Sequence, residues 1–324
     1  MTPVASILYS TYRAEPAFEW LVDSLARQLG DGDDVEVIVV DGAYSAERGE
    51  RWSLAIDGRF AFRHVPAKPS PYNGARRLTQ RDYFAASSAR NTGLVYARAP
   101  YVFFVDDCSV LMDGWWRAAR EAIQSGIVVA GAYYKCWEMR VAGGALETFR
   151  REDAGVDSRW ALGDAQRAVR VGGGQLFGGC IGAPRELLLQ VNGFDELCDS
   201  IGGEDWHLGV RLEFAGATIY YDRRMFSLES EELNRLGTPF LRLDPTLPPE
   251  AYMERLEDFG VRGRHVPGAC DSSHMLLDIV HGTGSPGTQG NYYWLADLDE
   301  AALAATVRRF PRHRWFDRVP LAEL

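Results

Sequence analysis

The chain has 324 residues, which is enough for one large α/β domain with an extension or for two modest domains. Hydrophobic residues make up 46% of the sequence and charged residues 25%, values typical of a folded globular protein rather than a disordered one. The formal net charge of -10 provides no general attraction to nucleic acid or to an anionic membrane. Either partner would therefore require a local basic patch.

Five cysteines are scattered along the chain, with neither the close pairs of a metal site nor the spacing of a disulfide framework. Reduced thiols of this kind are typical of cytoplasmic proteins, and we expect a cytoplasmic location here. Residues 1–9 lack the basic start and the length of a signal peptide. No apolar run reaches the roughly 18 residues that a membrane-spanning helix needs, so we expect no membrane span.

Strand and helix patterns alternate through the first half of the chain. Apolar runs predict buried strands over residues 4–9, 35–40 and 101–105. Apolar residues at helical spacing predict helices over residues 18–29 and 82–97. This alternation predicts an α/β protein with a mostly parallel, doubly wound sheet.

The second half of the chain is less regular. Asp113 is expected to cap the next helix, and Gly126 lies beyond the end of that helix. Residues 140–171 contain charges and glycines with weak periodicity, and we interpret them as an insertion or excursion. Short helices are predicted over residues 184–191 and 204–215.

Prolines, glycines and aromatic residues dominate the sequence from Gly237 onward. We therefore predict a main domain over residues 1–235 and a C-terminal extension over residues 236–324 that packs on it. Within the extension, residues 281–290 carry glycines at hinge-like spacing, so they form either a lid over a ligand or a plain connection.

Polar residues directly follow three of the predicted strands, namely residues 10–13, Asp41 and the pair Asp106-Asp107. Ligands of open α/β sheets bind outside the carboxyl ends of the strands, so this placement predicts a nucleotide pocket. Two adjacent carboxylates are costly to bury unless a cation or strong donors compensate them. Asp106 and Asp107 therefore either hold a divalent metal or begin a turn.

Two further polar groups occur at or within predicted helices. Residues 202–206 (GGEDW) place Glu204 and Asp205 in a first helical turn, where the helix dipole is already a sufficient structural reason for acids. Residues 87–93 (SSARNTG) either present Arg90 to a diphosphate or form a solvated helix face.

Taken together, these segments resemble the family 2 glycosyltransferases with the GT-A fold. The matching segments occur in the family's order between about residues 4 and 225, and they are residues 4–13, 37–42, 88–107, 178–196 and 203–216. The resemblance implies a GT-A, Rossmann-like, doubly wound mixed sheet. It also implies an inverting, metal-dependent glycosyltransferase that uses a nucleotide-sugar donor, often a UDP-sugar, with Mn²⁺ or Mg²⁺.

The resemblance also assigns roles to individual residues. It implies nucleobase contacts for Thr11, Tyr12, Arg13 and Asp41. It places Arg90 near the diphosphate, Asp106 toward the ribose and Asp107 toward the metal ion. Gly178 and Gly179 fall where the chain runs close to the donor sugar and the acceptor. The acidic pair Glu204-Asp205 matches the family's catalytic motif, with Asp205 as the base.

Two departures from the family's pattern concern the metal. Cys108 occupies the place of a third carboxylate, and a thiol is a poor ligand for Mg²⁺. Residues 225–229 (MFSLE) lack the histidine that many relatives carry there. His281 in the extension is a candidate for the missing metal ligand, although a lone histidine among glycines is more often structural.

The acceptor is unknown, and a glycan, a small molecule or modified DNA is compatible with the sequence. Residues 308–315 (RRFPRHRW) are basic and aromatic, which either suits a modified DNA base as acceptor or pairs with the acidic core. The rival activities are nucleotidyl transfer and inactive nucleotide-sugar binding. Residues 10–13 lack the glycine-rich phosphate loop of a nucleotidyltransferase, whereas Cys108 motivates the inactive alternative.

Overall fold

The computed structural model describes most of the chain up to residue 230 and short stretches beyond it. The described residues are 2–68, 70, 72, 77–80, 85–163, 166–199, 203–230, 244–248, 251, 264–265, 288–289 and 301. Of residues 152–156, 197, 264–265 and 288–289 only the backbone is described.

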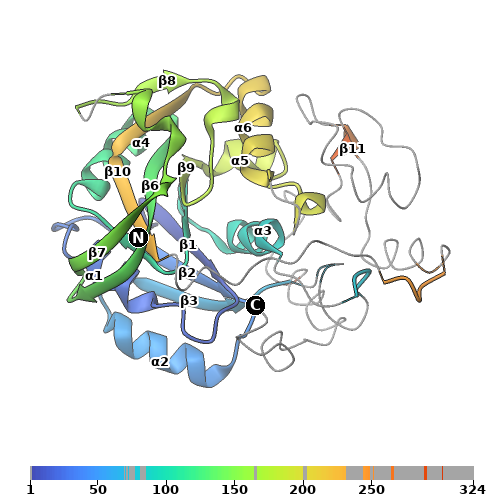
Figure 1. Cartoon of the computed structure of the whole chain (residues 1–324), viewed down its shortest axis with the longest axis horizontal. Coiled ribbons are helices and arrows are strands. Elements are labelled where there is room, and N and C mark those ends of the chain that lie inside the picture. Colours follow the sequence, from blue (N-terminus) through green and yellow to red (C-terminus); the bar gives the residue numbers. More distant parts are fainter. Residues whose placement is uncertain are drawn as a thin grey trace.

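A mixed β-sheet of ten strands forms the centre of the described residues (Figure 1). One half of this sheet consists of four parallel strands in the order β3-β2-β1-β4. These strands are β1 (Ala5–Thr11), β2 (Val35–Asp41), β3 (Ala61–Pro66) and β4 (Tyr101–Asp106). Their register pairs Thr11 with Asp41 and Ser10 with Asp106, so the predicted site residues end side by side.

The other half of the sheet changes direction at β9, which is antiparallel to both β4 and β6. Strand β10 is parallel to β6 and antiparallel to β5 and β8, and β7 forms a long hairpin with β6. The bounds are β5 (Ser109–Leu111), β6 (Val128–Ala142), β7 (Ala145–Val156), β8 (Val169–Val171), β9 (Cys180–Pro184) and β10 (Ile219–Ser230). A separate ladder joins β11 (Arg264–His265) and β12 (Thr288–Gln289). The predicted mixed, doubly wound α/β sheet is confirmed.

Helices cover both faces of the sheet in the described part of the chain (Figure 1). The α-helices are α1 (Phe18–Ala26), α2 (Ala46–Ile56), α3 (Ala86–Tyr96), α4 (Trp115–Ser125), α5 (Arg185–Gln190) and α6 (Glu204–Phe214). Short 3₁₀ helices are η1 (Ser158–Ala161), η2 (Gly173–Gln175) and η3 (Glu196–Cys198).

Alternate side chains of β1 and β2 enter two separate hydrophobic cores. Leu8, Ile38 and Val40 pack in the core that includes residues of α3, α5 and α6. Ile7 and Val37 pack on the opposite face with residues of α1, α2 and α4. Because both faces of these strands are covered, their sequences are unbroken apolar runs rather than alternating ones.

The structure bears on two expectations about local structure. Much of the predicted insertion or excursion over residues 140–171 belongs to the sheet, because it supplies the end of β6 together with β7 and β8. Their periodicity is weak because the β6–β7 ribbon contains register shifts, and a bulge interrupts the alternation of side chains. Asp113 does not cap α4, because Gly114 is the N-cap residue, in the left-handed conformation with φ of 91°, and no side chain caps this end.

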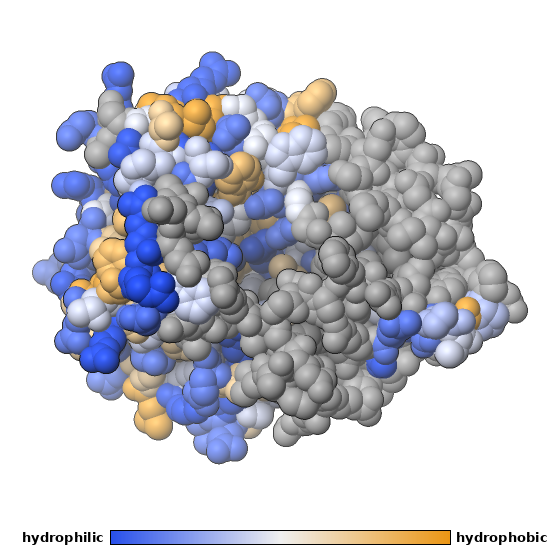
Figure 2. All heavy atoms as spheres, in the orientation of Figure 1, coloured by the Kyte–Doolittle hydropathy of each residue, from blue (hydrophilic) through white to orange (hydrophobic). Residues whose placement is uncertain are grey.

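The described surface is mainly hydrophilic on the face shown in Figure 2, and apolar residues are scattered over it. Within the described ranges, no helix is both long and apolar enough to cross a bilayer. Strand β10 ends at Ser230, and few residues after it are described. The division at residue 235 therefore stays a prediction.

Candidate active site

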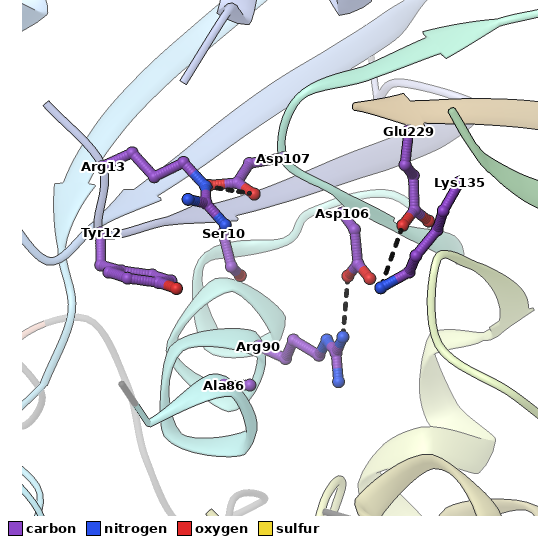
Figure 3. A pocket seen from close by; sticks show the side chains of 9 residues that line it. All are labelled: Ser10, Tyr12, Arg13, Ala86, Arg90, Asp106, Asp107, Lys135 and Glu229. Carbon is purple, nitrogen blue, oxygen red and sulfur yellow. Dashed lines mark hydrogen bonds and ion pairs between the residues drawn. The ribbon is translucent and has the colours of Figure 1, made fainter. Parts of the chain in front are cut away.

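A pocket opens at the carboxyl ends of β1 and β4, where the sequence predicts a nucleotide site (Figure 3). Its other walls come from α3, β6 and β10. The lining residues are Ser10, Tyr12, Arg13, Ala86, Arg90, Asp106, Asp107, Lys135 and Glu229. The structure thus brings together five predicted site residues, namely Tyr12, Arg13, Arg90, Asp106 and Asp107.

Asp107 forms one wall of the pocket with two residues from the end of β1. Its Oδ2 accepts a hydrogen bond from Thr11 Oγ1 at 2.7 Å, and its Oδ1 accepts one from Arg13 Nε at 3.1 Å. The side chains of Arg13 and Asp107 are 8% and 9% exposed. Burial raises the pKa of the Asp107 carboxyl, although Arg13 and Thr11 act in the opposite direction. Asp107 therefore holds in place the loop that follows β1, residues 12–17, which we call the β1 loop.

Asp41 lies behind this wall and is not among the residues that line the pocket. Its fully buried carboxylate accepts hydrogen bonds from Arg48 Nε at 2.8 Å and from the main-chain N–H of Ala43 at 2.7 Å. His64 Nε2 lies 3.0 Å from Asp41 Oδ2. Arg48 also donates to the main-chain oxygen of Arg13, so Asp41 supports the β1 loop from behind. This placement does not support a direct contact between Asp41 and a nucleobase.

Arg90 occupies the opposite side of the pocket and connects two acidic elements. Its Nη2 donates to Asp106 Oδ1 at 2.8 Å, and its Nη1 donates to Glu204 Oε1 at 2.7 Å. Its guanidinium also lies over the Phe194 ring, 5.1 Å from the centroid. Burial by itself would lower the pKa of Arg90, but Asp106 and Glu204 more than offset burial, and the pKa is raised. Arg90 therefore remains a cation that joins β4 to the start of α6.

Buried charges hold α3, and with it Arg90, in place. The carboxylate of Asp199 accepts hydrogen bonds from the main-chain N–H groups of Ser87 and Ser88, at 2.6 and 3.1 Å. Lys68 Nζ lies 2.5 Å from Glu196 Oε2 and also donates to Ser88 Oγ. Burial raises the pKa of Asp199 and lowers that of Lys68. A solvated face for α3 is therefore wrong, since its side chains from Ser87 onward are buried.

Asp205, in the first turn of α6, is joined to the loop that precedes β9. Its Oδ2 accepts a hydrogen bond from the main-chain N–H of Gly178, and its Oδ1 accepts one from its neighbour Trp206. A Cβ atom added at Gly178 would lie 3.4 Å from Asp205 Oδ2, 3.5 Å from Arg90 Nη2 and 3.8 Å from Asp106 Oδ2. Gly178 therefore lies within contact distance of three predicted functional side chains, and its missing side chain lets the main chain approach them.

Gly179 is constrained for a different reason. Its φ is +90°, and an added Cβ would lie 2.6 Å from Glu229 Oε1. Its main-chain oxygen accepts the N–H of Asp106 at 3.2 Å, which ties this loop to the end of β4. Gly179 thus shapes the junction between the loop and the acidic strand end.

Lys135 and Glu229 line the pocket, although the sequence did not indicate them. They are register partners on β6 and β10, with Lys135 Nζ 3.9 Å from Glu229 Oε2. Figure 3 shows both side chains on the wall beside Asp106. Glu229 ends the segment of residues 225–229, so an acid was present where a histidine was sought. Lys135 carried no comparable signal, because it lies in the middle of a long strand.

The residues described form no ready-made cluster for a divalent metal ion. Nowhere in these ranges do three His, Cys, Asp or Glu side chains come together to hold an ion. Both oxygens of Asp107, the predicted ligand, already accept hydrogen bonds. His281, the second predicted ligand, lies outside the described residues, as do residues 308–315 and most of the loop 281–290.

Comparisons with known proteins point to glycosyltransferases. A family model described as the N-terminal domain of galactosyltransferase matches residues 165–229. The uncharacterized glycosyltransferase EpsJ of Bacillus subtilis (strain 168) is 34% identical over 137 residues, which are 42% of this chain and 35% of EpsJ.

Solved structures resemble the fold at low sequence identity. GalNAc-T7 with UDP, GalNAc and Mn²⁺ has a TM-score of 0.50 at 12% identity, over 98% of this chain and 56% of that chain. The mannosyltransferase PcManGT from Pyrobaculum calidifontis, in complex with GDP-Man and Mn²⁺, has a TM-score of 0.48 at 18% identity, over 71% and 57%. S. aureus TarS 1-349 with UDP has a TM-score of 0.48 at 15% identity, over 94% and 70%.

The resemblance of this chain to glycosyltransferases with the GT-A fold is therefore confirmed, by sequence relatives and by the fold of its sheet. The chain spans 35% of EpsJ and 56% of the GalNAc-T7 chain, so these likenesses show the fold and a similarity to glycosyltransferases, not an activity or a substrate.

Proposed function

We propose that the protein transfers a sugar, with inversion, from a nucleotide-sugar to an acceptor hydroxyl. The observation that carries this proposal is the convergence of Asp205, Arg90 and Asp106 around Gly178. A general base, a fixed cation and an acid in this arrangement suit the transfer of a neutral group away from an anionic leaving group.

The donor occupies the pocket between the β1 loop and Arg90. The Tyr12 ring and the Arg13 guanidinium form the side that receives the nucleoside. The Ser10 hydroxyl is buried on this wall, and no described residue hydrogen-bonds it, which supports a polar ligand group at this position. Asp106 lies between this wall and Arg90, where it accepts a ribose hydroxyl. UDP-sugars are the first donors to test, because the family resemblance implies them.

The reaction is a single in-line displacement. Asp205 takes the proton of the acceptor hydroxyl as the acceptor oxygen forms a bond to the anomeric carbon of the sugar. The bond from that carbon to the diphosphate oxygen breaks, and its electron pair leaves with the nucleoside diphosphate. Asp205 is suited to this role because its hydrogen bonds to Gly178 and Trp206 orient the carboxylate while leaving lone pairs for the acceptor. Glu204 fixes Arg90 beside it.

The sequence resemblance also predicts Mn²⁺ or Mg²⁺. The described residues form no ready-made cluster for such an ion, and no step above depends on one. The acceptor remains a glycan, a small molecule or modified DNA. An acceptor that contains a sugar is favoured by one observation, because the Trp206 side chain is 39% exposed directly beside Asp205.

The test is the variant Asp205→Asn, assayed for release of the nucleoside diphosphate and for transfer, with donor affinity measured by calorimetry. Transfer should fall by about 10²- to 10⁴-fold, the usual contribution of a general base, while donor affinity is retained. Asp113→Asn is the matched control, since Asp113 is exposed and remote from the pocket lining. Normal turnover by Asp205→Asn would exclude the assignment.

The same assays separate the rival functions. A wild-type protein that binds nucleotide-sugars and turns over none, with any acceptor supplied, would be an inactive binding protein. Release of pyrophosphate from a nucleoside triphosphate and a sugar phosphate would instead identify a nucleotidyltransferase.

A further inference from the structure

The end of β4 carries two adjacent acids, but it is less suited to bind a metal ion than these two residues suggest. Asp107 lines the pocket, but Thr11 and Arg13 each donate a hydrogen bond to one of its oxygens. A divalent ion of the Mg²⁺ type needs oxygen ligands with free lone pairs that face the substrate phosphates. The Asp107 side chain is 9% exposed and its charge is already paired with buried Arg13, so it is less available to an ion than an exposed carboxylate would be.

Cys108 cannot replace the missing carboxylate. It is fully buried with φ of 57°, and its main-chain N–H donates to Tyr9 Oη at 3.0 Å. A thiol is in any case a poor ligand for a hard cation such as Mg²⁺. The strand end therefore presents one partly exposed carboxylate, that of Asp106, and Arg90 already donates a hydrogen bond to its Oδ1.

The same pocket carries cationic side chains of its own. Arg90 is fixed between Asp106 and Glu204, as described above. Lys135 enters from β6, and its side chain is 42% exposed. Its Nζ lies 3.9 Å from Glu229 Oε2, which is beyond hydrogen-bond distance, so this ion pair leaves the ammonium donors available to a ligand. Figure 3 shows the ammonium group on the side of the pocket where Arg90 and Asp106 lie.

We infer that Lys135, together with Arg90, binds the diphosphate of the nucleotide-sugar, so that donor binding requires no divalent metal ion. This inference rests on the proposed function, because it identifies the side chains whose positive charge binds the diphosphate of the donor. An ammonium and a guanidinium form charge-assisted hydrogen bonds with phosphate oxygens. In a partly buried pocket they stabilise charge that develops on the departing diphosphate, which is the task that a metal ion performs elsewhere. Glu229, 2% exposed, keeps Lys135 near this position.

The experiment measures the affinity of the full-length protein for UDP, GDP, ADP and dTDP by calorimetry. The protein is first stripped of metal, and each titration is run in EDTA and again with Mn²⁺. The expected result is binding of at least one nucleoside diphosphate with equal affinity in both conditions. Lys135→Ala should weaken that binding in EDTA by about tenfold or more, the loss of a hydrogen bond to a charged group. Lys135→Arg should recover most of the affinity, because it keeps the charge.

Arg140→Ala is the matched control, because Arg140 is an exposed cation on the same strand and does not line the pocket. It should leave affinity unchanged, and thermal unfolding of each variant reports whether the fold is intact. Binding in Mn²⁺ alone, or unchanged affinity in Lys135→Ala, would overturn the inference and leave the proposed function standing. Binding in neither condition would overturn the proposed function, and the inference with it.

Discussion

The two sides of the pocket use the same kinds of charged residue differently. On the side of β1 and β2, Asp41 and Asp107 are buried and held by arginines. On the side of α3 and β6, the Asp106 and Lys135 side chains are 36% and 42% exposed. A charge buried in a pair is committed to the fold, because removing its partner leaves it without compensation. A partly exposed charge can exchange water for a ligand at little cost to the fold.

This difference separates residues that the family resemblance groups together. Asp41 and Asp106 both follow strands, and both are expected to contact the donor. Only Asp106 lines the pocket, whereas Asp41 supports the β1 loop from behind. Position at a strand end is therefore not sufficient to assign a role, and burial of the carboxylate decides between support and contact.

The largest expected effect concerns the buried side. Asp41→Ala should lower the free energy of unfolding by about 3–5 kcal/mol, because it leaves the Arg48 guanidinium without its buried partner. Chemical denaturation measures this change. The control is Glu15→Ala, which breaks the exposed pair with Arg51 and should cost at most about 1 kcal/mol. An equal loss of free energy of unfolding in both variants would contradict the proposed difference between buried and exposed charges.

An intermediate effect is expected from the adjacent acids at the end of β4. Asp107→Asn should lower the free energy of unfolding by about 1–3 kcal/mol, since Arg13 loses a buried charged acceptor. Asp106→Asn should have a smaller effect on stability and should weaken donor binding by about tenfold. Denaturation and calorimetry on the two variants measure both quantities. If Asp107→Asn instead lost donor affinity without losing stability, Asp107 would be a ligand-binding residue rather than a supporting one.

The smallest expected effect concerns Gly178, around which Asp205, Arg90 and Asp106 converge. Gly178→Ala places a methyl group at ordinary contact distance from Asp205, Arg90 and Asp106, so the fold should remain stable. Turnover should fall by about tenfold, because the space for the sugar is reduced and a displacement of about 1 Å is costly in catalysis. Steady-state kinetics measure this loss. Gly179→Ala provides the contrast, because its strained φ and its contact with Glu229 predict reduced stability as well. Full turnover in Gly178→Ala would mean that the sugar does not occupy this space.

Much of the fold was predictable from local sequence. The strands near residues 4–9 and 101–105 and the helix near 204–215 lie close to where their apolar patterns predict them. The long β6–β7 hairpin was not predictable from local sequence, because its ribbon is partly exposed and irregular in register. The candidate site was predictable where a motif continues along the chain, as at Asp106-Asp107. It was not predictable at Lys135, whose neighbours in sequence carry no sign of the pocket.

Local sequence was sufficient for the alternation of strands and helices in the first half of the chain, the polar ends of β1, β2 and β4, and the resemblance to glycosyltransferases. These properties follow from apolar periodicity and from short motifs, both of which are local. The three-dimensional arrangement alone sets which acid stays partly exposed in the pocket and which cation lies beside it. Arg13 and Asp107 are 94 residues apart, and Arg90 and Glu204 are 114 residues apart. Such pairs arise from strand register and helix packing, which no local pattern encodes.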